Sequence, residues 1–93
     1  MVVGICSVEL RIPGNDSLKG KRSVVRRIKE RVKNTFNVSV AEVADLDTLQ
    51  RAGLGIAFVS NDASHVHSTL SKVVNFIDRL YLAEIVDYHI EVW

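Results

Sequence analysis

The sequence predicts an α+β domain of the ferredoxin-like type, with a four-stranded antiparallel sheet and two helices on one face. Segments that alternate with a period of two and segments with apolar residues three or four apart follow one another in the order βαββαβ. Each helical segment has one apolar stripe and each strand has one mainly apolar face, and this arrangement buries all of them. Right-handed crossovers predict that the first and last strands lie side by side in the middle of the sheet. The 93 residues, 47% of them apolar, suffice for one core, so we expect a single domain over residues 1–93.

The first half of the chain predicts a strand and a long helix. Residues 2–12 alternate between apolar and polar side chains, which is typical of a strand. Residues 13–16 are all turn formers, and Ser17 is suited to cap a helix. Apolar residues then recur at three- and four-residue steps, which predicts an amphipathic helix from about Leu18 to Thr35.

The second half predicts three strands and the second helix. Valines at 38, 40 and 43 suggest a strand, and residues 45–48 form a connection to a third strand from about Gln50 to Ser60. Asp62 can cap a helix whose apolar stripe runs from Val66 to Leu80. Alternation from Val86 to Val92 then predicts the last strand.

The first helix carries most of the positive charge of a chain whose net charge is only +1. The chain has twelve basic residues, and eight of them fall within this helical segment: Lys19, Lys21, Arg22, Arg26, Arg27, Lys29, Arg31 and Lys33. A turn of 100° per residue places five of them within about 80° of one another. We call these five the basic ridge: Lys19, Arg22, Arg26, Lys29 and Lys33.

The one-sided charge of this helix favours a polyanionic partner. Like charges three or four residues apart cost a few tenths of a kcal/mol per pair, so a merely solvated face would usually mix signs. The candidate nucleic-acid-binding residues are therefore Lys19, Lys21, Arg22, Arg26, Lys29 and Lys33. The alternative, a solvated surface whose charge is compensated through space by acids such as Glu42 and Asp45, stays open.

The sheet face away from the helices is a second candidate surface. Alternation places Val3, Ile5, Ala57, Ile85 and Trp93 on it. The strands that an RNA-recognition motif would use for base stacking offer no aromatic residues there. Small and apolar residues instead predict association with a second copy or another protein, with Val3, Ile5, Ala57 and Trp93 as interface residues.

The remaining residues do not form a pattern typical of catalysis or metal binding. Cys6 is the only cysteine and lies in an apolar strand pattern, where a thiol packs as a small hydrophobe. His65 and His67 are two residues apart, whereas chelation on a helix needs three or four. His89 stands between Asp87 and Glu91 on one strand face, a row that alternation alone produces often. We therefore expect no enzyme activity, no catalytic residues, no metal and no cofactor.

The apolar stretches are far shorter than the roughly 20 residues that span a bilayer. The start of the chain enters a strand pattern without a basic leader region. We expect a cytoplasmic protein with no membrane partner.

Several segments resemble the bacterial YlxP-like proteins, a family of unknown function. They include Ser-Leu-Lys-x-Lys-Arg at residues 17–22, Ser-Asn-Asp at residues 60–62 and Tyr-x-Ile-Glu-Val-Trp at residues 88–93. The resemblance implies a ferredoxin-like fold and no established enzymatic activity. Family members are often encoded among translation initiation and ribosome maturation genes, which implies contact with RNA or the ribosome. Gly20 departs from the family pattern, because relatives often have Glu there, and it removes the capping box that Glu would form with Ser17.

These observations predict a small RNA- or ribosome-associated binding module that contacts phosphates through its basic first helix. The alternative is a homo-oligomeric protein-interaction module that uses the open sheet face and binds no nucleic acid.

Overall fold

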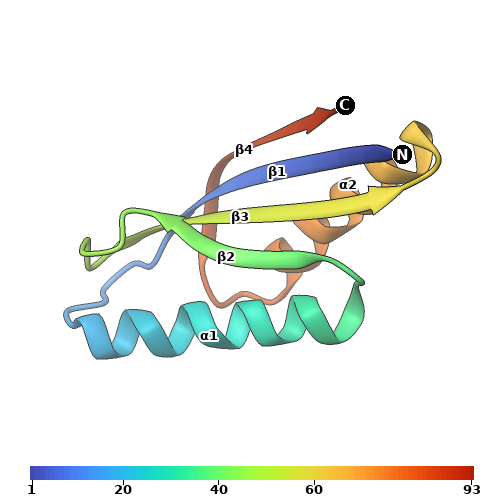
Figure 1. The fold of residues 1–93 in the computed structure, drawn as a ribbon. Coiled ribbons are helices and arrows are strands. Elements are labelled where there is room, and N and C mark those ends of the chain that lie inside the picture. Colours follow the sequence, from blue (N-terminus) through green and yellow to red (C-terminus); the bar gives the residue numbers. More distant parts are fainter.

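The strands and helices follow one another in the predicted order βαββαβ in a computed structural model, which describes all residues 1–93. The elements are β1 (Val2–Arg11), α1 (Leu18–Thr35), β2 (Ser39–Ala44), β3 (Arg51–Ser60), α2 (Ala63–Arg79) and β4 (Glu84–Val92). Both helices cover one face of a four-stranded antiparallel sheet, which confirms the ferredoxin-like α+β fold (Figure 1).

Both helices begin at the caps that the sequence predicts. The Ser17 hydroxyl accepts a hydrogen bond of 3.0 Å from the backbone N–H of Gly20. The Asp62 carboxylate accepts hydrogen bonds from the backbone N–H groups of Ser64 and His65. Because these bonds satisfy N–H groups that have no partner inside the helix, they fix where α1 and α2 start.

The sheet order is β2-β3-β1-β4. β1 and β4 are neighbours, as expected, but the prediction that both lie in the middle of the sheet is wrong. The two central strands are β1 and β3, because each crossover passes one strand: α1 leads from β1 past β3 to β2, and α2 leads from β3 past β1 to β4. β4 is therefore an edge strand, as Figure 1 shows.

The core lies between the sheet and the helices. On β1, Cys6, Val8 and Leu10 are at most 1% exposed, and the α1 and α2 stripes pack against that face. Gly4 continues the same row at the point where α2 comes closest. A Cβ atom at Gly4 would collide with Val66 Cγ1 and would lie 2.8 Å from Leu70 Cδ1.

A β-bulge in β4 changes which of its side chains face the helices. The register of β1 and β4 shifts so that Glu9 is opposite Asp87 and Leu10 is opposite Ile85, which leaves Val86 without a partner. Ile85 therefore points to the helix side and packs against the core. Its expected place on the open sheet face is wrong, because a strict period of two does not hold across a bulge.

Neither helix combines the length and the apolar character that crossing a membrane requires.

Candidate functional site: a basic helix and an open sheet face

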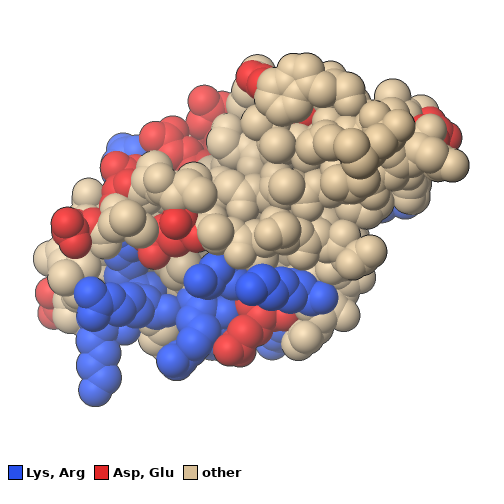
Figure 2. Space-filling model, in the orientation of Figure 1, with Lys and Arg blue, Asp and Glu red and all other residues tan.

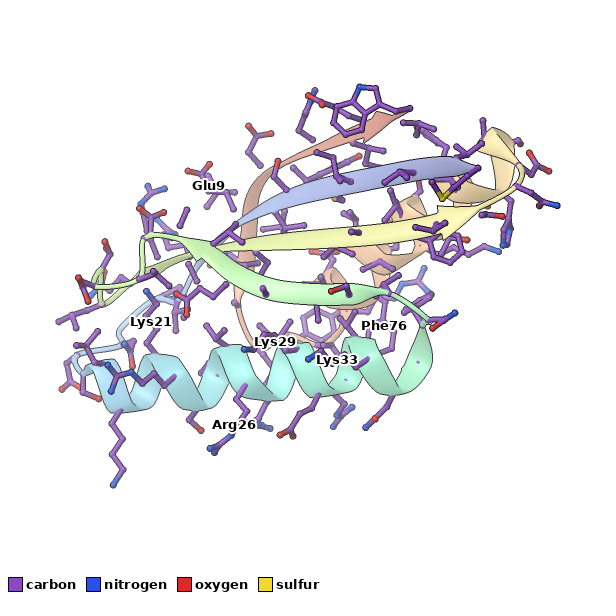
Figure 3. All side chains as sticks on the ribbon, viewed as in Figure 1. Glu9, Lys21, Arg26, Lys29, Lys33 and Phe76 are labelled. Carbon is purple, nitrogen blue, oxygen red and sulfur yellow. The ribbon has the colours of Figure 1, made fainter.

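Lys and Arg side chains gather along α1 (Figure 2). Four residues of the basic ridge are exposed, namely Lys19, Arg22, Arg26 and Lys33, and Lys29 is half-buried. In Figure 3, Lys29 and Lys33 lie on the side of α1 nearer to β2, whereas Arg26 projects from the side away from it. The periodicity of α1 places the five predicted cations within an arc of about 80° around the helix, from the side near β2 to the side away from it.

No ridge residue has an acidic partner within 4.0 Å. The ion pairs of the molecule are Arg11–Glu84, Lys21–Glu42, Arg51–Glu9 and His89–Glu91. Glu30, the one acid on α1, pairs with none of the ridge cations. The five ridge cations therefore form no direct ion pair within the protein.

Lys21 is not part of this surface, and its prediction as a nucleic-acid-binding residue is wrong. Its side chain is 1% exposed and points toward the sheet, where its ammonium group donates a hydrogen bond to the Asp45 carbonyl oxygen. The spacing could have revealed this, because Lys21 precedes Val25 and Ile28 by four and seven residues and so shares their buried face.

The charge of Lys21 is met inside the protein by Glu42. The Lys21 Nζ atom lies 3.1 Å from Glu42 Oε2. This buried oxygen has no other polar partner in the protein. Glu42 lies on β2, opposite Leu54 of β3, and its side chain is 16% exposed. This pair joins α1 to β2, and the Asp45 contact extends the link to the β2–β3 connection.

A second polar network holds the start of α1 against the same connection. Asn15 donates hydrogen bonds to the carbonyl oxygens of Ser17 and Leu49, and Gln50 donates one of 3.3 Å to the Asn15 carbonyl oxygen. A Cβ atom at Gly20 would collide with the Asn15 side chain. Gly20 therefore makes room for the Asn15 side chain. Asn15 in turn ties the first turn of α1, which lacks a capping box, to the β2–β3 connection.

The four predicted interface residues adjoin one another at one end of the open sheet face. Val3 is opposite Val59 on β3 and exchanges two backbone hydrogen bonds, of 3.0 and 2.8 Å, with Trp93. Ile5 is opposite Ala57. Trp93 is 67% exposed, Val59 56% and Ile5 37%. Sequence reasoning thus found an apolar surface, although Trp93 ends an edge strand and not a central one.

The other end of this face is acidic and hollowed. Glu9 is directly opposite Asp87, and a hollow of about 210 Å³ lies beside them, lined also by Val43, Gly53 and His89. His89 Nε2 lies 3.0 Å from Glu91 Oε1. The structure has no group of three or more His, Cys, Asp or Glu residues placed to hold a metal ion. Cys6 lies in the core, and burial raises the pKa of its thiol to about 11.

Solved structures of low sequence identity share the fold. The chain is similar to a C-terminal segment of the alpha subunit of aIF2 from Pyrococcus abyssi, with a TM-score of 0.53 and 14% identity over 98% of this chain. It is also similar to LarC2, the C-terminal domain of a cyclometallase involved in the synthesis of the NPN cofactor of lactate racemase, with a TM-score of 0.52 and 10% identity. The chain covers 49% and 55% of these two structures, so it spans about half of each.

The sequence comparison is more specific. The chain is 43% identical over 77 residues to the uncharacterized protein YlxP of Bacillus subtilis (strain 168), a match that covers 83% of this chain and 84% of that protein. The family model described as "Protein of unknown function (DUF503)" matches residues 3–90. The chain therefore belongs to the DUF503 family, which includes YlxP and has no known function.

Proposed function

We propose that this protein is a small RNA- or ribosome-associated binding module that contacts phosphates through the basic ridge on α1. The observation that carries the proposal is that five cations share one flank of α1 and none has an acidic partner within 4.0 Å. Unpaired charges of one sign that are held by a rigid helix suit a ligand that supplies the opposite charge.

The length of the ridge favours a polymer over a small anion. At a rise of 1.5 Å per residue, successive cations are about 4.5 to 6 Å apart along the helix axis, and Lys19 and Lys33 are about 21 Å apart. Several phosphates in a row match this dimension, whereas one phosphate group would engage only one or two of these side chains.

The surroundings of the ridge favour contacts to the nucleic-acid backbone over reading of bases. Base stacking needs exposed aromatic rings, and the exposed ones are Tyr81, Tyr88 and Trp93. All three lie in β4 or the segments next to it, outside α1. Binding should therefore respond to RNA shape and charge and show little sequence preference.

The experiment compares two double variants with the same change in net charge. Arg22→Glu/Arg26→Glu reverses two exposed ridge cations, and Lys72→Glu/Arg79→Glu reverses two exposed cations on α2. Affinity for a structured RNA is measured by fluorescence anisotropy at 50 mM salt. The ridge variant should lose at least tenfold in affinity and the α2 control should change much less. No RNA binding by the wild type, or an equal loss in both variants, would reject the ridge as the binding surface.

An interaction module that uses the open sheet face is the second candidate, and the contiguous exposure of Ile5, Val59 and Trp93 favours it. Ala57→Glu would place a charge beside Ile5 in this patch. If the patch binds a protein, partners recovered from lysate after nuclease treatment should be lost with Ala57→Glu and kept with the ridge variant. Partners that vanish on nuclease treatment alone would instead support the RNA proposal.

A further inference from the structure

β4 is the less protected of the two edges of the sheet. The opposite edge, β2, has only six residues and carries a bulge near its end. β4 has nine residues, and its free edge contains neither Lys nor Pro, the residues that commonly block pairing with another strand. Beyond the bulge at Val86, its register with β1 is regular from Asp87 to Val92.

The free edge of β4 presents backbone groups in a defined pattern. Because Val3 and Trp93 exchange both of their hydrogen bonds, every second residue back from Trp93 directs its N–H and C=O toward β1. Tyr88, Ile90 and Val92 therefore direct theirs outward, away from the sheet. Three acceptors and the N–H groups of Ile90 and Val92 are thus available to another strand, whereas the Tyr88 N–H donates a hydrogen bond of 2.9 Å to Asp87 Oδ1 that pairing would have to replace.

The side chains of these three residues form an apolar row on the helix side that the chain itself leaves incompletely covered. Tyr88 is 52% exposed, and Ile90 and Val92 are partly buried. Val8 and Cys6, which lie opposite Tyr88 and Ile90 on β1, are each 1% exposed. The helices cover the row on β1, and a strand added at the β4 edge would bring further side chains against the flank of the row on β4.

We propose that a second copy of this chain occupies this edge, with β4 paired antiparallel to β4 of its partner about a two-fold axis at Ile90. Ile90 then pairs with its own copy through outward-facing backbone groups, and Tyr88 lies opposite Val92 on both sides of the axis. These are aromatic and β-branched cross-strand pairs, which stabilise a sheet. On the open face, His89 lies opposite Glu91 of the other copy, and this complementary pair occurs twice.

Other registers are defined by moving the two-fold axis to a neighbouring residue of β4. Charge and geometry disfavour those that keep the helices of both copies on the same side of the sheet. An axis at His89 places Asp87 opposite Glu91 twice, and an axis at Glu91 places two glutamates opposite each other. Like charges directly opposite destabilise a strand pair. An axis at Tyr88 runs the pairing into the bulge at Val86. The result at Ile90 is one continuous eight-stranded sheet, in a closed two-fold dimer.

The register is tested by cysteine substitution and mild oxidation of the full chain. Cα atoms of a directly opposed hydrogen-bonded pair are about 5.5 Å apart, within the range for a disulfide. Ile90→Cys should therefore form a disulfide-linked dimer, because residue 90 pairs with itself. Tyr88→Cys should not, because its two copies would be about 13 Å apart. Both variants are made in a Cys6→Ala background, because Cys6 lies opposite residue 90 on β1 and would otherwise offer the introduced thiol a disulfide partner in the same chain.

The charge pairing is tested by sedimentation of exposed-residue variants. His89→Glu should weaken dimerisation by about tenfold, since it places Glu opposite Glu91 twice. His89→Glu/Glu91→His should restore it, because an imidazole and a carboxylate again lie opposite each other. Ala57→Glu should leave the dimer intact, which separates this edge from the open sheet face. A wild type that is monomeric at high micromolar concentration, or equal cross-linking of the two cysteine variants, would overturn the proposal.

Discussion

Lys21 and Arg22 are neighbours in the sequence and have opposite environments. Lys21 is 1% exposed and pairs with Glu42, whereas Arg22 is exposed and has no acidic partner. The difference follows from their direction on α1, since a rotation of about 100° separates them. Of the basic residues in the Lys-x-Lys-Arg motif, Lys21 therefore supports the fold, and only Lys19 and Arg22 are available to a ligand.

We predict that Lys21→Met lowers the free energy of unfolding by about 2 to 4 kcal/mol, because it leaves the largely buried Glu42 carboxylate without its cation. Lys21→Met/Glu42→Met should recover most of this loss, since it removes the second charge as well. Urea denaturation measures both variants. Arg22→Met is the control and should stay within about 0.5 kcal/mol of the wild type. A Lys21→Met protein as stable as the wild type would contradict the stabilising role of the pair.

We predict that Cys6 makes stability fall at high pH. The pKa of its thiol is raised to about 11 in the folded protein from 9.0, because burial disfavours the thiolate. The unfolded chain thus loses this proton first, and stability that is fully present below pH 9 declines by up to roughly 1.4 kcal/mol per pH unit between pH 9 and 11. Comparison of wild type and Cys6→Ala isolates the contribution, because other groups titrate equally in both. Identical pH profiles would show that the thiol ionises equally in both states.

At the scale of elements, the contact of α2 with β1 depends on the absence of a side chain at Gly4. A Cβ atom there would collide with Val66 and crowd Leu70, both of which are fully buried. Gly4 therefore sets how closely α2 approaches the sheet.

We predict that Gly4→Ala destabilises the protein by about 1 to 3 kcal/mol through overpacking. Thermal or urea denaturation measures the loss, and Ser7→Ala on the exposed face of the same strand should have little effect. Gly4→Ala/Val66→Ala should be less destabilised than the sum of its single variants, because Val66→Ala removes the nearest clashing atom. Strict additivity would show that α2 simply moves away.

The sequence predicts the helices and strands well, but it does not predict the bulges, the order of the strands or the contacts between distant residues. Helix α1 runs from Leu18 to Thr35 as expected, since long apolar periodicity and a cap at Ser17 define it locally. The bulge at Val86 and the edge position of β4 could not be predicted, because both depend on which strands pair at long range. The ridge could be predicted from helical spacing, but the ion pair of Lys21 depends on Glu42, 21 positions away in a different element. For the same reason, no local pattern reveals that Asn15 fills the space above Gly20.

At the scale of the whole molecule, charge is separated although the net charge is only +1. Cations gather on α1, and acids gather at the end of the sheet that carries Glu9 and Asp87 (Figure 2). A polyanion should therefore approach with α1 leading, and the acidic end should turn away from it.

We predict that RNA binding weakens with salt, with a slope of about −3 to −4 in a plot of log affinity against log salt concentration. This value corresponds to about four phosphate contacts and is shallower for single strands than for duplexes. Loss of two ridge cations should reduce the slope by about two, whereas the α2 control should keep it. A wild-type slope near zero would mean that binding does not depend on phosphate contacts.

The backbone pairing of Val3 with Trp93 also has a consequence for how the chain can be rearranged. The first and last residues of the sheet lie side by side (Figure 1), so a short linker could join Trp93 to Met1 and close the chain into a ring. A circular permutant opened between α2 and β4 should then fold, because the breaks would avoid the Lys21 and Asn15 networks. The linker would join the ends of two adjacent strands, so the permutant would keep the basic ridge on α1.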